Sequence, residues 1–293
     1  MQQLTFVCLL ALLILGGCTP AQSKEADKAL PEQSLEVPKG KLFIIGGGKR
    51  PPELVSELIT VSGIEKAGEI VILPMSSAEP DTSIFYGTKQ FTDLGISRSR
   101  ITGMHFVKDS IPTNWIEQLQ HAELIYIPGG SQSRFMEAVL HTPIHDAIQA
   151  AYLNGATIAG TSAGAAVMSE KMITGDEYKH PKYTGNFRTI ESKNIILAEG
   201  LGLLKNAIVD QHFIRRMRMN RLISVVIEYP DQLAIGIDES TAIIVEQNQA
   251  RVVGLSQVIV IRNPNHEVRE QNGLLGADNL ELSVKLSGET FTL

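Results

Sequence analysis

A serine stands between small residues in the run Gly160-Thr161-Ser162-Ala163-Gly164-Ala165, which follows the apolar residues 156–159. Small residues around a serine, between a strand and a helix, are typical of a nucleophile elbow, because the sharp turn leaves no room for side chains. The Ser162 hydroxyl is therefore a candidate covalent nucleophile. An ordinary glycine-rich turn that closes an αβ unit gives the same pattern, so the hexapeptide alone leaves both interpretations open.

Two backbone amides are candidates for stabilising an oxyanion beside this serine. The amide of Ala163 opens the expected helix and points toward the same space as the serine hydroxyl. Gly130 lies in Pro128-Gly129-Gly130, after the apolar run 124–127, and its amide has no side chain in the way. The two amides would form an oxyanion hole.

A nucleophilic serine needs a base, and His212 is the best placed of the seven histidines. It follows the apolar run 207–209, and the end of a strand would carry it into the same crevice as Ser162. His180, in a polar loop, is the reserve candidate for the base. The histidines on other polar stretches are expected to be structural: His121, His141, His145 and His266.

A carboxylate should fix the tautomer of the imidazole. Glu239 follows the apolar run 233–237 and is favoured for this role, although a turn between two strands would also explain it. Its rivals are Asp176 and Glu177, which follow the nucleophile segment. Glu177 is the reserve acid.

Four arginines stand within nine residues of His212: Arg215, Arg216, Arg218 and Arg221. If the segment is helical, Arg218 and Arg221 share a face. In a chain of net charge −6, this cluster favours a pocket for carboxylates. Nucleic-acid binding is not expected, because the overall charge is negative and no aromatic residues interleave with the arginines.

Short apolar runs that end in glycine or proline indicate buried parallel strands at 42–45, 69–73, 124–127 and 157–159. Helical stretches at 52–64 and 144–154 lie between them, and four short strands are expected in the last third of the chain, at 233–237, 241–245, 251–253 and 257–261. The pattern predicts a doubly wound α/β fold with a mostly parallel sheet. The run Gly46-Gly47-Gly48 lacks the spacing of a phosphate loop, so we interpret it as a turn that lines the site.

The N-terminus carries a targeting signal. An apolar run at 4–15 ends in Leu15-Gly16-Gly17-Cys18, which resembles a bacterial lipobox, although no Lys or Arg precedes the run. We expect residues 1–17 to be a lipoprotein signal peptide, 18–39 a flexible tether and 40–293 a single α/β domain. Lipid on Cys18 would anchor an exported protein to the cell envelope, at the outer membrane where there is one. A plain secretory signal would make it extracellular.

Cys8 and Cys18 are the two cysteines of the chain, and Cys8 lies in the segment expected to be removed. The mature chain would then have no intrachain disulfide, no cysteine nucleophile and no cysteine-based zinc site.

Several motifs together resemble the serine peptidase family that includes cyanophycinases and aspartyl dipeptidases. They are Pro128-Gly129-Gly130-Ser131-Gln132, the serine hexapeptide, the segment from Asp210 to Leu222, and Gly236-Ile237-Asp238-Glu239. The resemblance implies a class I glutamine amidotransferase-like (flavodoxin-like) fold, often dimeric, with no metal or cofactor. It also implies cleavage of cyanophycin, a polyaspartate that carries arginine on its side chains, into β-Asp-Arg dipeptides.

By the same resemblance, Ser162 is the nucleophile, His212 the base and Glu239 the acid. The implied substrate-binding residues are Gln132, Asp210, Gln211, Arg216, Arg218 and Arg221. Ser131 stands where many relatives have an acidic residue. Two other functions remain open: an aspartyl dipeptidase for other small peptides, and a non-catalytic envelope lipoprotein that binds acidic peptides.

Overall fold

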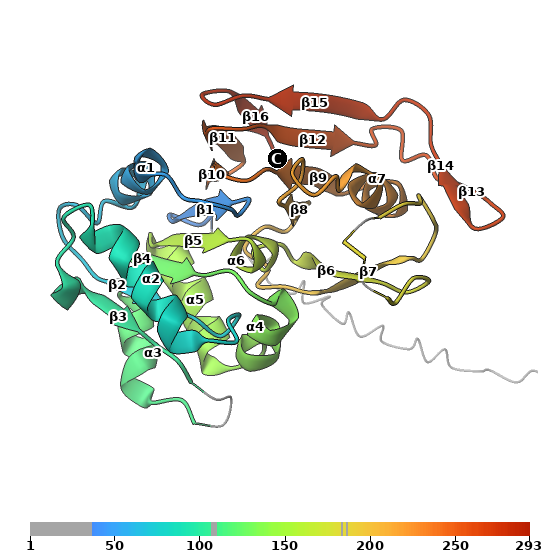
Figure 1. Ribbon diagram of the computed structural model, residues 1–293. Coiled ribbons are helices and arrows are strands. Elements are labelled where there is room, and N and C mark those ends of the chain that lie inside the picture. Colours follow the sequence, from blue (N-terminus) through green and yellow to red (C-terminus); the bar gives the residue numbers. More distant parts are fainter. Residues whose placement is uncertain (1–36, 107–109, 183, 186) are drawn as a thin grey trace, which may run out of the picture. The chain divides into compact units, whose positions relative to one another are not determined.

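A computed structural model describes residues 37–106, 110–182, 184–185 and 187–293 (Figure 1). Glu36–Leu293 forms one compact unit. The expected signal peptide, Cys18 and most of the expected tether lie outside the described residues. Within the described ranges, no helix is both long and apolar enough to cross a bilayer.

The main sheet has eight strands, and its parallel half builds the site. Five parallel strands lie in the order β1 (Lys41–Ile45), β5 (Thr157–Thr161), β4 (Leu124–Ile127), β2 (Ile70–Ile72) and β3 (Ile101–Gly103). Beyond β1 the sheet continues with antiparallel β10 (Thr241–Glu246), β11 (Gln249–Gly254) and β16 (Thr290–Thr292). The predicted α/β fold with a mostly parallel central sheet is confirmed.

Helices cover both faces of the parallel strands, because successive strand side chains point to opposite faces. On one face, α1 (Pro52–Ser62) and α2 (Pro80–Thr92) pack over Phe43, Ile72 and Tyr126. On the other face, α3 (Thr113–Gln120), α4 (Gln132–Val139) and α5 (Pro143–Asn154) pack over Ile44 and Ile125. Figure 1 shows this layered arrangement.

A second sheet supplies the other half of the site. Its order is β15 (Glu281–Lys285), β12 (Val258–Arg262), β9 (Leu233–Ile237) and β8 (Ala207–Gln211), with α7 (Met219–Glu228) packed on one face. The opposite face joins the core of the main sheet through Val209, Ile235 and Val260. Strands β8 and β9 are parallel, with Gln211 opposite Ile237, so both strands end at the same level.

Local structure departs from the sequence expectations in two places. The helix expected at 52–64 ends at Ser62, because Gly63 takes a left-handed conformation with φ 74°. The basic segment is not one helix: residues 213–217 form a turn, Arg218 is the N-cap, and α7 begins at Met219. Elements without a sequence prediction include α2, β3, η1 (Arg98–Arg100), α4 and the hairpins β6–β7 (Lys171–Glu177, Ile195–Glu199) and β13–β14 (Arg269–Gln271, Leu274–Gly276). The helix expected after Ser162 is present as α6 (Ala163–Ala166).

Candidate active site

Ser162 occupies a strained turn between β5 and α6. Its backbone has φ 55° and ψ −111°, a conformation that non-glycine residues rarely adopt. The neighbouring glycines are sterically required: a Cβ on Gly160 would lie 2.1 Å from the Gly164 carbonyl oxygen, and one on Gly164 would lie 2.1 Å from the Ile127 carbonyl oxygen. The turn therefore has the geometry expected of a nucleophile elbow.

Two hydrogen bonds connect Ser162, His212 and Glu239. The Ser162 Oγ lies 2.8 Å from His212 Nε2, and His212 Nδ1 lies 2.7 Å from Glu239 Oε1. A carboxylate accepts, so Nδ1 carries the proton that donates to Glu239, and Nε2 is left to accept the serine proton. The structure thus brings together the three residues that the sequence singled out, in the order that nucleophile activation requires.

Strand register explains why His212 and Glu239 meet. Each follows the end of a parallel strand, His212 directly after β8 and Glu239 two residues after β9. The base is fixed from the backbone as well, because the His212 amide donates to the Gly46 carbonyl oxygen over 2.6 Å. The carboxyl ends of parallel strands meet at one edge, where α/β proteins form their sites.

The glycine turn after β1 lies against the base and the acid, as expected from the sequence. A Cβ on Gly47 would lie 2.4 Å from His212 Cε1, and one on Gly48 would lie 2.7 Å from Glu239 Oε2. Both glycines also have positive φ, 108° and 69°. Glycine is thus required here by close approach and by backbone conformation.

The reserve candidates have other partners. Glu177, the last residue of β6, accepts a hydrogen bond at Oε1 from Asn194 Nδ2 over 2.8 Å. His180 Nε2 lies 2.7 Å from Glu191 Oε2 at a half-exposed position. The geometry therefore favours His212 and Glu239 over His180 and Glu177.

Burial lowers the pKa of His212 below its ordinary value. Desolvation is the main cause; the hydrogen bond to Glu239 opposes it, and the positive charge of Arg216 adds to the lowering. Only 9% of the His212 side chain is exposed. A lowered pKa keeps the imidazole neutral near pH 7, which is the form that can accept a proton from Ser162.

Asp210 and Arg221 form a buried ion pair, which differs from the expectation that they contact substrate. Arg221 Nε donates to Asp210 Oδ2 over 2.8 Å, and Arg221 Nη2 donates to Asp210 Oδ1. The side chain of Arg221 is 1% exposed and that of Asp210 is 0% exposed, and the Arg221 guanidinium stacks over the Phe187 ring at 4.5 Å. Both carboxylate oxygens of Asp210 accept hydrogen bonds from Arg221, so the protein itself already partners this carboxylate.

Of the other expected substrate residues, three are also held by the protein: Gln132, Gln211 and Arg218. Arg218 is 4% exposed, and its Nη1 donates to the Gln211 carbonyl oxygen over 2.6 Å and to Gln211 Oε1. Gln132 is 8% exposed and donates from Nε2 to the carbonyl oxygens of Ile173 and Thr174, over 3.1 and 2.6 Å. Arg216 is exposed and close enough to His212 to affect its pKa. Of the three arginines expected to bind substrate, Arg216 is therefore the one that remains accessible beside His212.

Ser76, which the sequence analysis did not single out, holds the loop that carries Gly130. Its Oγ donates to the Pro128 and Gly129 carbonyl oxygens over 2.9 and 3.0 Å. A Cβ on Gly130 would lie 2.1 Å from the Ser76 carbonyl oxygen, and a Cβ on Gly129 would lie 3.8 Å from Ser162 Oγ. The sequence signal for Ser76 was its place just after Pro74, which follows the apolar run 69–73.

No group of three or more His, Cys, Asp or Glu side chains in the described part of the chain could hold a metal ion.

The mostly parallel α/β sheet and the serine–histidine–glutamate array define the class of α/β serine hydrolases. Residues 42–253 match peptidase family S51. Two cyanophycinases are similar in sequence: that of Trichormus variabilis is 31% identical over 91% of this chain and 90% of its own, and that of Synechococcus elongatus is 30% identical over 87% and 80%. The chain therefore belongs to peptidase family S51 and is a serine peptidase.

Solved structures show the same fold. A peptidase from an acI-B1 Actinobacterium superposes with a TM-score of 0.65 at 22% identity, covering 88% of this chain and 98% of the other. A putative peptidase E from Listeria monocytogenes EGD-e gives 0.52 at 15% identity, covering 74% and 99%.

Proposed function

We propose that this peptidase cleaves aspartyl peptide bonds through an acyl-enzyme on Ser162, with cyanophycin as its substrate and β-Asp-Arg dipeptides as products. The observation that carries the mechanism is the pair of hydrogen bonds from Ser162 to His212 and from His212 to Glu239, 2.8 and 2.7 Å long.

In the proposed reaction, Ser162 Oγ attacks the scissile carbonyl carbon as His212 Nε2 takes its proton. The amides of Gly130 and Ala163 stabilise the oxyanion, and Glu239 stabilises the imidazolium. The C–N bond then breaks, and the amine leaves with the proton from His212. Water attacks the resulting ester, again with His212 as the base, and releases the acid product and free Ser162.

Two observations support a substrate that carries free carboxylates. The sequence relatives named above are cyanophycinases. The exposed guanidinium of Arg216 acts on His212 electrostatically, so it lies where it could attract a substrate carboxylate. The buried arginines Arg218 and Arg221 would add a positive potential behind it, although Asp210 offsets part of their charge.

The substrate is tested by incubating the full chain with cyanophycin and with a panel of α- and β-aspartyl peptides, and identifying the products by mass. We expect β-Asp-Arg to accumulate from cyanophycin. Cleavage confined to short aspartyl peptides would assign a dipeptidase instead, and tight binding without turnover would assign a non-catalytic binding protein.

We also propose that the protein is exported and attached to the cell envelope by lipid on Cys18. The support is the lipobox-like run 15–18 after a short apolar segment. Two acyl chains on one cysteine suffice for stable anchoring.

A homodimer, suggested by the resemblance of the sequence motifs, is tested by light scattering of the purified chain.

A further inference from the structure

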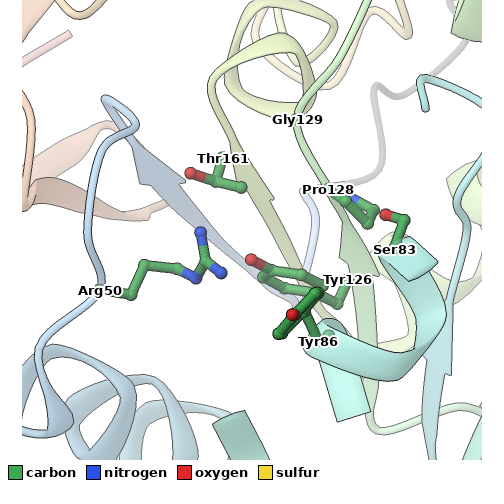
Figure 2. Close-up of a pocket in the computed structure, with 8 residues that line it drawn as sticks. Arg50, Ser83, Tyr86, Tyr126, Pro128, Gly129 and Thr161 are labelled. Carbon is green, nitrogen blue, oxygen red and sulfur yellow. The ribbon is translucent and has the colours of Figure 1, made fainter. Parts of the chain in front are cut away.

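A small cavity lies beside the turn that carries the candidate nucleophile. Its volume is about 150 Å³, and its lining includes Arg50, Tyr86, Tyr126, Gly129 and Thr161 (Figure 2). Thr161 immediately precedes Ser162, and a Cβ on Gly129 would lie 3.8 Å from Ser162 Oγ. The cavity therefore lies next to the turn that carries Ser162, on the side of the sheet that α1 and α2 cover.

Two hydroxyl groups in this cavity are buried and unpaired. Tyr126 is 1% exposed and Thr161 is 3% exposed, and neither hydroxyl has a hydrogen-bond partner within the described residues. Buried polar groups in proteins are almost always hydrogen-bonded, so each orphaned group needs an explanation. A bound ligand that accepts hydrogen bonds from both would satisfy them.

Arg50 provides a positive charge in the same place. Its guanidinium points toward the hydroxyl ends of Tyr126 and Thr161 (Figure 2). Its Nε donates to Gln90 Oε1 over 2.6 Å, which holds the side chain in this direction. The ion pairs found among the described residues do not include Arg50, so its charge has no carboxylate partner in this part of the chain.

We propose that this cavity is a subsite that binds a carboxylate of the peptide substrate. Arg50 supplies a charged donor, and Tyr126 and Thr161 supply two neutral donors that the protein leaves unpaired. A guanidinium recognises a carboxylate through two parallel hydrogen bonds, and the cavity is large enough for a carboxylate on a short carbon chain. The inference rests on the proposed function, because it assigns the place of one acidic group of that substrate.

The first test compares acidic peptides with their amides. The wild type, Arg50→Gln and Tyr126→Phe are assayed on aspartyl peptides in which each free carboxylate is amidated in turn. For one of these carboxylates, we expect amidation to lower kcat/KM of the wild type at least tenfold. Arg50→Gln and Tyr126→Phe should each reduce this preference, which is the ratio of kcat/KM for the acid to kcat/KM for the amide. Arg251→Gln is the control, since Arg251 pairs with Glu57 away from the cavity. A preference that is the same in all four proteins would overturn the proposal.

Stability separates ligand binding from a structural role of Tyr126. Because its hydroxyl is buried without a partner, removing it should leave the melting temperature unchanged or higher. A large fall in melting temperature for Tyr126→Phe would show that the hydroxyl supports the fold, which contradicts the proposal.

A binding experiment makes the test independent of turnover. Succinate and succinamide are titrated calorimetrically into Ser162→Ala and into Ser162→Ala/Arg50→Gln. We expect succinate to bind the first protein and to lose at least tenfold affinity in the second, while succinamide binds neither. Equal succinate affinity in both would refute the subsite. If succinate binding depends on Arg50 but the wild type hydrolyses no peptide, the proposed function fails and the subsite stands.

Discussion

Replacing Glu239 by Gln should disable the base without removing it. In the wild type, the carboxylate accepts the proton of His212 Nδ1 at 2.7 Å, so Nε2 faces Ser162 without a proton. A glutamine amide can turn its NH₂ group toward Nδ1, which forces the proton onto Nε2. The imidazole then cannot accept the serine proton.

The second effect of the substitution is electrostatic. The charge of Glu239 and its hydrogen bond to His212 both raise the pKa of the imidazole against its burial, so they favour the imidazolium that forms as Ser162 attacks. In a serine protease triad, the matching acid-to-amide change lowers kcat about 10⁴-fold. We expect a loss of this order, which is about 5 kcal/mol of transition-state stabilisation.

The assay is kcat for β-Asp-Arg release by Glu239→Gln, with Glu177→Gln as the matched control. Glu177, at the end of β6, accepts a hydrogen bond from Asn194 and lies outside the Ser162–His212–Glu239 array. Because Glu177→Gln is isosteric, its kcat should stay within about threefold of the wild type. Near-normal turnover by Glu239→Gln, together with a loss of orders of magnitude in Glu177→Gln, would refute the assignment and transfer the role to Glu177.

Three other perturbations follow from the site. Arg216→Gln removes a charge that lowers the pKa of His212, so that pKa should rise and the acid limb of the kcat/KM–pH profile should move to higher pH; no movement would contradict the electrostatic role. Gly47→Ala places a Cβ 2.4 Å from His212 Cε1 and should lower kcat about 100-fold. Gly95→Ala is its control, since φ is also positive there but nothing lies within 4 Å; equal losses of activity would refute steric displacement of the base. Cys18→Ser should abolish labelling by a fatty-acid probe and processing of residues 1–17, whereas a wild type that takes up no label would refute the lipobox.

The sequence predicts the array well because each part depends on local signals. Glycines around Ser162 identify the turn, and apolar runs before His212 and Glu239 identify strand ends. The rule that parallel strands carry sites at their carboxyl ends then brings the three residues together. What the sequence does not show is that His212 and Glu239 follow strands of a second sheet, since strand pairing is a long-range property.

The roles of the arginines were less predictable for the same reason. Arg218 and Arg221 carry the same charge as Arg216 and lie within five residues of it, yet only Arg216 is exposed. Their burial depends on Asp210, which was itself expected to bind substrate. The small cavity was equally unpredictable, because its lining residues Arg50, Tyr126 and Thr161 come from separate parts of the chain. No local pattern indicates that the hydroxyls of Tyr126 and Thr161 are left unpaired.

The central claim, that Ser162 is the nucleophile, is tested most directly by the rate at which Ser162→Ala releases β-Asp-Arg from cyanophycin. The change removes one oxygen from a small side chain, so the fold should be retained. Ser224→Ala, which removes a hydroxyl that donates to the Asn220 carbonyl oxygen in α7, is the control. Our account predicts that Ser162→Ala loses at least about 10⁴-fold in kcat while Ser224→Ala stays active. Turnover by Ser162→Ala within about tenfold of the wild type would contradict a covalent serine mechanism.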